Sequence, residues 1–344
     1  MANLDSLPYA SLGMGPDNEV EDFLLMISSL LQPYLNQAVS RVPEAKGLKE
    51  GVAYQIRSGG KRVRAAMCAA ACEAFCGSCL PALSFAAAIE HLHNFTLIHD
   101  DITDGDAERR GQPSAWKRFG LAHSITIGDV FASLSALSIL ESDYEQQTKL
   151  SLMYMLSEVG LEVAEGQSLD IMLRESDTPS MAEYLECTRK KTGAFFAMAT
   201  IGGGMIGGAS VQALISLKEA TMLAGTAFQI KDDLLDLMEG KGRPTGSDTL
   251  EGKRTLLVIH ALQYANERDK QKLLSILNKP RLAKTQAEVQ WVSDLYQQTG
   301  AIDSAQQMCE HLIEQAKPHF ATLPESEAKE LLSRISHYLI TRVR

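Results

Sequence analysis

Apolar residues recur at helical spacing through most of this 344-residue chain, and no stretch alternates strictly between apolar and polar residues as a half-buried strand does. Ala, Leu, Met, Glu and Gln, which favour helices, are abundant. Hydrophobic residues make up 45% of the chain, enough for a sizeable core. Length alone would allow two average domains. The composition favours one domain, and we predict an all-α, single-domain helical bundle with a central cavity.

Glycine and proline residues mark the breaks between the predicted helices. Helices are predicted at residues 19–42, 49–56, 63–75, 82–104, 123–140, 147–173, 181–199, 211–237 and 254–264, with several more after Glu267. Residues 1–18 are rich in Ser, Gly and Pro, so we expect a flexible N-terminal arm there and the folded domain at 19–344. The arm lacks a basic-then-apolar leader, which leads us to expect a cytoplasmic protein.

The net charge of −10 argues against nucleic acid or a membrane surface as the main partner. A long uncharged stretch at 192–217 raises the question of a membrane span, but it contains six glycines. We therefore predict two buried helix pieces with a glycine-rich break and no membrane span. Cys72, Cys76 and Cys79 have the spacing of an iron–sulfur site, yet they belong to an Ala-rich helical run. This context favours free, mostly buried thiols in a reducing compartment.

Two aspartate clusters of the same form lie more than a hundred residues apart, and they consist of Asp100, Asp101 and Asp104 and of Asp232, Asp233 and Asp236. The first and last aspartates of each cluster share one helix face, where they repel each other unless a cation compensates them. Oxygen-only ligands favour Mg²⁺, Mn²⁺ or Ca²⁺, and so sparse a set suits Mg²⁺ with a substrate phosphate completing its shell. One cluster alone would indicate a solvated acidic face. Two clusters, both flanked by apolar helical sequence, predict a metal site.

From about residue 25 to 344, the chain resembles the trans-isoprenyl diphosphate synthases (polyprenyl synthetases), nearest to the short-chain geranylgeranyl and farnesyl diphosphate synthases. The motifs that carry the resemblance are Gly59-Gly60-Lys61-Arg62, His93 seven residues before Asp100, the first aspartate cluster followed by Arg109-Arg110-Gly111, Lys191-Thr192, Phe228-Gln229 before the second cluster, Gly246-Ser247-Asp248 and Gly252-Lys253. The resemblance also implies a homodimer.

This resemblance implies roles for individual residues. Asp100, Asp104 and Asp232 would be the principal ligands of three Mg²⁺ ions (Mn²⁺ is an alternative), with Asp101, Asp233 and Asp236 as further or water-mediated metal partners. The allylic diphosphate would contact Arg109, Lys191, Gln229 and Lys253, whereas isopentenyl diphosphate would contact Lys61, Arg64, His93 and Arg110. Thr192 would be a further substrate-binding residue. The catalytic set would be Asp100, Asp104, Lys191, Asp232 and Lys253. On its own, His93 would more often be a core histidine, and Gln229 could merely cap a buried carbonyl.

The implied reaction is head-to-tail condensation of isopentenyl diphosphate with an allylic diphosphate. In this family, bulk beneath the first aspartate cluster limits product length. Phe95, five residues before Asp100, and Thr96 resemble the geranylgeranyl (C20) type, with farnesyl (C15) as the alternative. The cavity floor could instead be formed by His91 or Leu92, or by the helix around residues 153–159.

Two rival functions use a similar fold. A class I terpene cyclase performs the same ionisation, but it has no use for the second diphosphate pocket that Lys61, Arg64, His93 and Arg110 imply. A regulatory subunit of a heteromeric synthase would tolerate broken aspartate clusters, and both clusters are complete here. The sequence therefore favours the synthase.

Overall fold

The computed structural model describes residues 16–45, 47–238 and 245–341, and it confirms the predicted all-α fold. Within these residues, the only strands are β1 (Glu108–Arg109) and β2 (Gln112–Pro113), which pair antiparallel, Glu108 opposite Pro113. They form a small hairpin directly after the first aspartate cluster. The predicted N-terminal arm falls mostly on residues outside the described ranges and stays a prediction.

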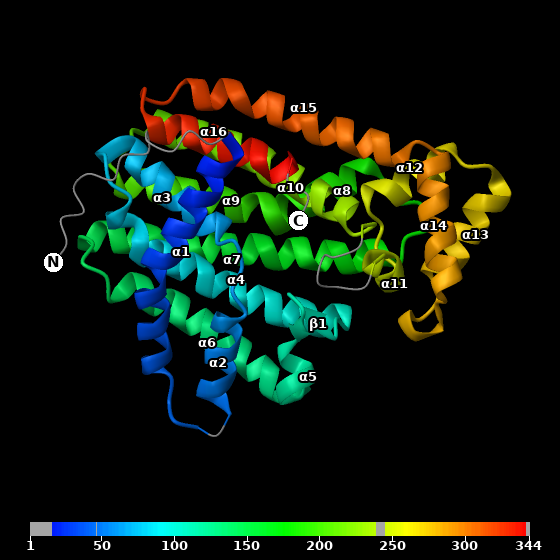
Figure 1. The fold of residues 1–344 in the computed structure, drawn as a ribbon, viewed down its shortest axis with the longest axis horizontal. Helices are drawn as coiled ribbons and strands as arrows, with labels where there is room; N and C mark the ends of the chain where they lie inside the picture. Colours follow the sequence, from blue (N-terminus) through cyan, green and yellow to red (C-terminus); the bar gives the residue numbers. More distant parts are fainter. Residues whose placement is uncertain (1–15, 46, 239–244, 342–344) are drawn as a thin grey trace.

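The helices run in the order α1 (Pro16–Arg41), α2 (Leu48–Arg57), α3 (Val63–Cys76), η1 (Leu80–Ala82), α4 (Leu83–Asp104), α5 (Ala115–Phe119), α6 (Leu121–Leu140), α7 (Gln146–Arg174), α8 (Met181–Thr188), η2 (Arg189–Gly193), α9 (Ala194–Ile206), α10 (Val211–Leu235), α11 (Ser247–Glu251), α12 (Leu256–Tyr264), α13 (Glu267–Leu277), η3 (Arg281–Ala283), α14 (Gln286–Gln298), α15 (Ala301–Ala321) and α16 (Glu327–Thr341). Figure 1 shows the long helices side by side in one bundle, with α12, α13 and α14 grouped at one end.

The helix predicted at 181–199 is divided in the structure. The π-helical turn η2 separates α8 from α9 there, and π-helical turns are frequent at functional sites. The five-residue helices α5 and α11 were not predicted, because segments so short carry no readable periodicity. The other predicted helices agree with the structure to within a few residues.

The uncharged stretch at 192–217 forms two helix pieces, as predicted. A glycine-containing break separates α9 from α10, and α9 is largely buried, whereas the first turn of α10 is exposed at Val211 and Ile215. Glycine is required where α9 crosses α3, since a Cβ at Gly203 would lie 2.0 Å from the carbonyl oxygen of Cys68. All six cysteines of the chain are free thiols, and among them only Cys76 is exposed.

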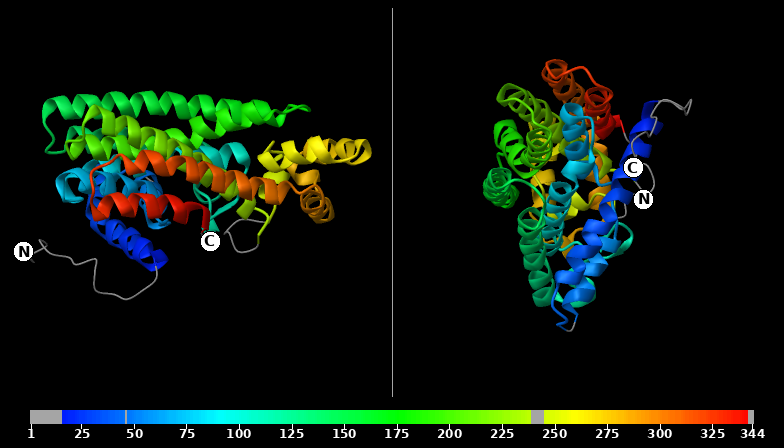
Figure 2. Two further views of the ribbon diagram at one scale, coloured as in Figure 1. Left: turned by 90° about the horizontal axis from the view of Figure 1, so that it is seen from above. Right: turned by 90° about the vertical axis from the view of Figure 1, so that its left-hand side faces the viewer.

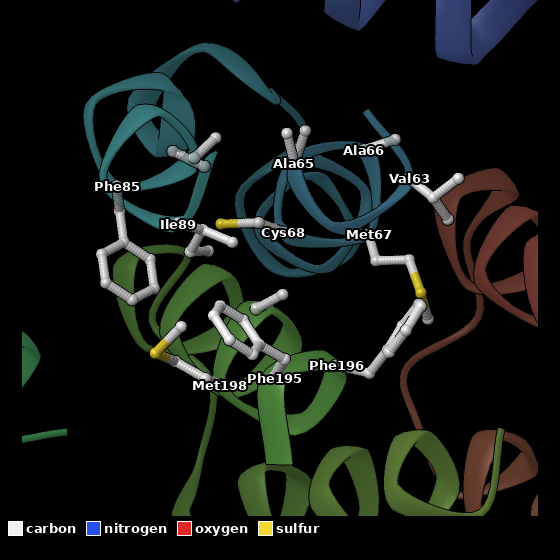
Figure 3. Close-up of a cluster of buried hydrophobic side chains, with 14 of the residues drawn as sticks. Val63, Ala65, Ala66, Met67, Cys68, Phe85, Ile89, Phe195, Phe196 and Met198 are labelled. Atoms are coloured by element: carbon white, nitrogen blue, oxygen red, sulfur yellow. The ribbon is translucent and has the colours of Figure 1, made fainter. Parts of the chain in front are cut away.

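The core lies between α3, α4 and α9, with α10 beneath them. Figure 3 shows Phe195, Phe196 and Met198 of α9 packed toward α3 and α4. A second apolar cluster joins α10 to α12, α13, α14 and α15. α10 belongs to both clusters, and Ile230 and Leu234 near its C-terminal end are held in the second one.

α6 has an apolar side that the rest of the chain leaves partly uncovered. Among the described residues, it is the one helix long and apolar enough to cross a membrane by length and composition, and 39% of its most apolar window is buried in the bundle. It packs against α4 and α7. Figure 2 shows α7 along one outer edge of the molecule in both views, away from α1.

Candidate active site

A cavity of about 820 Å³ opens between α4, α7, η2 and α10. Most of the residues singled out in the sequence line it, namely Lys61, Arg64, His93, Phe95, Thr96, Asp100, Asp104, Arg109, Arg110, Lys191, Thr192, Gln229, Asp232, Asp233 and Lys253. Asp101 and Asp236 are not among its lining residues. The chain therefore brings its two aspartate clusters together with the basic motifs around one space.

Both aspartate clusters lie at the C-terminal ends of helices. Asp100 and Asp104 belong to the last turn of α4, which Gly105 ends at a positive φ of 70°, and Asp232 belongs to the last turn of α10. Helix C-termini carry partial negative charge, so additional carboxylates there are unfavourable without a cation. Burial raises the pKa of Asp100, although Lys191 lies nearby and opposes that shift. The carboxylates on the cavity wall thus favour a bound cation.

The two remaining aspartates are held behind the cavity wall. Asp101 accepts a hydrogen bond of 2.6 Å from Nε of Arg109. Asp236 accepts from the Ser247 hydroxyl at 3.1 Å and from the backbone N–H of Asp248 at 2.9 Å. Asp236 caps α10 with helical backbone angles, and its N–H donates to the carbonyl oxygen of Asp232, so the helical spacing of the two residues is kept. The Asp236 carboxylate also holds the start of α11. The pairing of Asp232 with Asp236 around one cation stays a prediction.

Two partly buried lysines place positive charge beside the carboxylates. Nζ of Lys191 lies 3.0 Å from Asp170 and 4.0 Å from Asp100. Nζ of Lys253 lies 2.7 Å from Glu251, 2.9 Å from Asp248 and 3.6 Å from Asp104. Burial would lower the pKa of each lysine, but the surrounding carboxylates outweigh it and raise the pKa of both. Both side chains therefore stay charged in the cavity.

Lys191 and Thr192 lie within the π-helical turn η2, which approaches α7 closely. A Cβ at Gly166 would lie 2.6 Å from the backbone nitrogen of Lys191, so only glycine fits at this crossing. The turn and the crossing together direct the Lys191 side chain into the cavity.

Asp170 and Arg174 of α7 were not singled out in the sequence, yet they contact the site directly. Arg174 lies 2.8 Å from Asp104 and 3.0 Å from Asp170, which also binds Lys191. Burial would raise the pKa of Asp170, but Lys191, Lys253 and Arg174 hold it below its usual range. The sequence signal was weak: an Asp and an Arg four residues apart on a predicted helix, shortly after Gly166.

A hydrogen-bonded chain of side chains supports the second aspartate cluster. The Thr192 hydroxyl donates to Gln229 at 2.9 Å, and Gln229 donates to Asp233 at 3.0 Å. The Tyr184 hydroxyl donates to the other oxygen of Asp233 at 2.7 Å. Burial and the nearby Asp248 raise the pKa of Asp233 to about 7. The Gln229 amide therefore orients a carboxylate, whereas the alternative interpretation had it donating to a backbone carbonyl.

The opposite part of the cavity is basic. Nη1 of Arg64 lies 3.2 Å from Nε2 of His93, and the Arg64 guanidinium packs over the rings of Phe195 and Phe196. Arg110 donates to the backbone carbonyl of Gly59. Burial, together with Arg62, Arg109 and Arg64, lowers the pKa of Arg110 to about 10. Burial and the same kind of crowding, from Arg64 and Arg110, lower the pKa of His93 well below its usual value. Crowded cations of this kind favour a bound anion.

Phe95 lies on the cavity wall below Asp100 and packs edge-on against His99, with ring centroids 4.5 Å apart. Of the alternative floor residues, Leu92 lines the cavity, whereas His91 is fully buried and its ring contacts the Ser138 hydroxyl. α7 lines the cavity at residues 160, 163, 164 and 167 and not at 153–159. The wall opposite Phe95 therefore lies one to two turns further along α7 than expected.

A third acidic group adjoins the first cluster. Carboxylate oxygens of Asp104, Asp106 and Glu251 all lie within 4.8 Å of one another, as metal-binding groups do. Arg281 bridges this group, 2.9 Å from Asp106 and 3.4 Å from Glu251. Burial raises the pKa of Glu251 to about 8. The donor set around the cavity consists of carboxylate oxygens, which fits a hard divalent cation and not zinc or copper.

Comparisons with known proteins identify the class to which this fold and site belong. The polyprenyl synthetase family model matches residues 45–296. The short-chain isoprenyl diphosphate synthase of Methanothermobacter thermautotrophicus is 34% identical over 328 residues, which cover 94% of this chain and 99% of that protein.

Solved structures agree with this assignment. The geranylgeranyl pyrophosphate synthetase of Pyrococcus horikoshii has a TM-score of 0.84 and 32% identity, covering 94% of this chain and 99% of that one. A polyprenyl synthase of Caulobacter crescentus, complexed with calcium and isoprenyl diphosphate, has a TM-score of 0.84 and 28% identity, covering 94% and 98%.

The chain belongs to the polyprenyl synthetase family. The predictions of this family and of a prenyltransferase enzyme are thereby confirmed.

Replacing Asp170 with Asn tests how the charges of the site are balanced. Asp170→Asn leaves Lys191 and Arg174 buried beside a neutral amide, and we expect the free energy of unfolding in urea at pH 7 to fall by about 2–3 kcal/mol. Because the folded pKa lies below the ordinary one, this contribution is present at neutral pH and is lost only in strong acid. Asp129→Asn is the matched control, since that side chain is 65% exposed. An equal loss of unfolding free energy in Asp170→Asn and Asp129→Asn would contradict the conclusion that Asp170 balances the charges of Lys191 and Arg174.

Proposed function

We propose that the chain is a divalent-metal-dependent synthase that joins isopentenyl diphosphate head-to-tail to an allylic prenyl diphosphate. One observation carries the proposal: a single cavity has a carboxylate-rich end and, opposite, a cluster of crowded cations. Each end suits a different diphosphate. The apolar wall between them, with Phe95 and Phe195, suits a prenyl chain.

The carboxylate-rich end is the proposed site of the allylic diphosphate. Asp100, Asp104 and Asp232 would hold Mg²⁺, three ions by family resemblance, with Asp101, Asp233 and Asp236 as further or water-mediated metal partners. When bound, the metal would neutralise the diphosphate and stabilise it as a leaving group. The complex of the Caulobacter crescentus relative with calcium and isoprenyl diphosphate supports this assignment. Arg109, Lys191, Thr192, Gln229 and Lys253 are the proposed further contacts to this diphosphate.

The basic end is the proposed site of isopentenyl diphosphate. This end of the cavity is surrounded by Lys61, Arg64, His93 and Arg110. Glu90 is the carboxylate among the cavity residues here, and it pairs with Arg62 at 2.6 Å. A diphosphate there is held by the protein's own cations. A terpene cyclase would have no use for this cluster.

The proposed reaction needs positioning and charge stabilisation by these residues. The allylic C–O bond breaks and its electron pair leaves with the diphosphate, where Lys191 and Lys253 meet the developing charge. The double bond of isopentenyl diphosphate forms the new C–C bond with the allylic carbon. A proton then leaves the condensed cation, and the released diphosphate is the proposed base.

Product analysis tests this proposal directly. With Mg²⁺, isopentenyl diphosphate and farnesyl diphosphate, the purified protein should release diphosphate and form mainly geranylgeranyl diphosphate. Asp100→Ala should lower kcat at least about a hundredfold while thermal unfolding changes little, because it removes a proposed metal ligand and not a core contact. A cyclic hydrocarbon formed without consumption of isopentenyl diphosphate would instead establish a cyclase.

A C20 product is proposed because Phe95 limits the space below Asp100. Phe95→Ala removes that bulk, and we expect the main product to lengthen by one or more five-carbon units in chromatography of the dephosphorylated alcohols. Leu92 also lines the cavity, and Leu92→Ala is the comparison variant for product length. Unchanged product length in Phe95→Ala would place the floor elsewhere, and a wild-type product that stops at C15 would contradict the C20 assignment.

We also propose a homodimer that works in the cytoplasm, formed through the outer faces of α6 and α7. Leu150, Tyr154, Leu161 and Met172 of α7 are exposed and follow one another at spacings of four, seven and eleven residues, as the members of one helical stripe do. Leu121, Ile125 and Leu140 of the adjoining α6 are exposed too. Exposed apolar surface of this extent is typical of an interface.

Charge introduced into this stripe should separate the subunits. Tyr154 and Leu161 are each 70% exposed, so a Tyr154→Glu/Leu161→Glu variant should keep its fold and halve the mass measured by light scattering at micromolar concentration. Leu282→Glu is the matched control, because Leu282 is 99% exposed but lies between α13 and α14. A monomeric wild-type protein, or a double variant that remains dimeric, would rule out this interface.

A further inference from the structure

Lys61, at the basic end of the cavity, is held by a residue near the far end of the chain. Its Nζ donates a 2.7 Å hydrogen bond to the hydroxyl oxygen of Tyr338 on α16 and lies 5.1 Å from the centroid of that ring. Tyr338 in turn donates its proton to Glu21 of α1 at 2.9 Å. The resulting relay from Lys61 to Tyr338 to Glu21 joins three segments that are remote in sequence.

Tyr338 is itself placed firmly. It is 5% exposed, and α16 packs against both α1 and α3 (Figure 1). An ion pair between Arg334 and Glu19 also connects α16 to α1. Tyr338 is absent from the residues that line the cavity, so it reaches the site only through Lys61.

We propose that Tyr338, supported by Glu21, is a positioning residue that orients the Lys61 ammonium toward the diphosphate of isopentenyl diphosphate. The inference rests on the proposed function and adds a residue from α16 that none of the sequence motifs contains. Binding of isopentenyl diphosphate at the basic end would then depend on how α1 packs against α16.

The chemistry of the relay supports this role. A lysine side chain is long and flexible, and its ammonium has three donors and no acceptor. Because Tyr338 gives its own proton to Glu21, its oxygen lone pairs are available to one Lys61 donor. An ammonium with three donors can keep this contact to Tyr338 while it also contacts an anion in the cavity. Holding one donor in place reduces the freedom that the side chain must lose when the diphosphate binds.

The test separates the two diphosphates. Tyr338→Phe keeps the ring and removes only the oxygen, so we expect the KM for isopentenyl diphosphate to rise roughly three- to tenfold while the KM for farnesyl diphosphate stays unchanged. Glu21→Gln should shift the same constant in the same direction by less. Tyr144→Phe is the matched control, since its hydroxyl also donates at 2.7 Å, to the backbone of Pro81, away from the cavity.

A double variant asks whether the effect passes through Lys61. In a Lys61→Gln background, Tyr338→Phe should change the KM for isopentenyl diphosphate no further. An equal rise in both KM values, an effect that persists without Lys61, or no effect of either Tyr338→Phe or Glu21→Gln would overturn the proposal.

Calorimetry of isopentenyl diphosphate binding provides a readout that needs no turnover. A wild-type protein that binds this ligand but forms no C–C bond would refute the proposed function alone. In that case, a weaker Kd in Tyr338→Phe would still support the positioning role, and an unchanged Kd would refute it.

Discussion

The structure depends on compensation of carboxylates that are held at the C-terminal ends of two helices. Asp100 and Asp104 end α4, and Asp232 lies in the last turn of α10, where the helix dipoles add to their mutual repulsion. Lys191, Lys253 and Arg174 relieve part of this cost, and each is itself partly buried and oriented by further carboxylates. Such an arrangement is stable only if α7, η2 and α11 are all in place, so the bundle and the site are formed by the same contacts.

Close packing of helices makes this compensation possible. Gly166 lets α7 approach η2, and Gly203 lets α9 approach α3, in both cases at distances that a Cβ would prevent. The first crossing places Lys191 next to Asp170. The second brings Phe195 and Phe196 of α9 under the Arg64 guanidinium of α3. Small residues at the crossings thus determine where both the cations and the aromatic wall lie.

Much of the fold and of the cavity lining could be predicted from the sequence, because helical spacing alone places Asp104 and His93 relative to Asp100. The same spacing extends to Asp236, whose N–H bonds to the carbonyl oxygen of Asp232, but it did not reveal that the Asp236 carboxylate also accepts from Ser247 and Asp248 of α11. Contacts between remote segments were not predictable either. Asp170 reaches Lys191 across 21 residues, and Arg281 reaches Asp106 across 175, through packing that no local pattern encodes. The roles of these residues remain proposals, although their positions are now defined.

The opposite charges of the two ends offer a reason why only one of two chemically similar diphosphates would be cleaved. In the proposed reaction, a diphosphate at the carboxylate-rich end can bind there only together with divalent cations, because the aspartates would otherwise repel it. The cations that permit binding also stabilise the departing charge, so binding and activation occur together at that end. At the basic end, Arg64, His93 and Arg110 would bind a diphosphate without metal, and a diphosphate that lacks metal is a poorer leaving group. Isopentenyl diphosphate would therefore keep its diphosphate while it attacks, and the product could return to the carboxylate-rich end as the next allylic substrate.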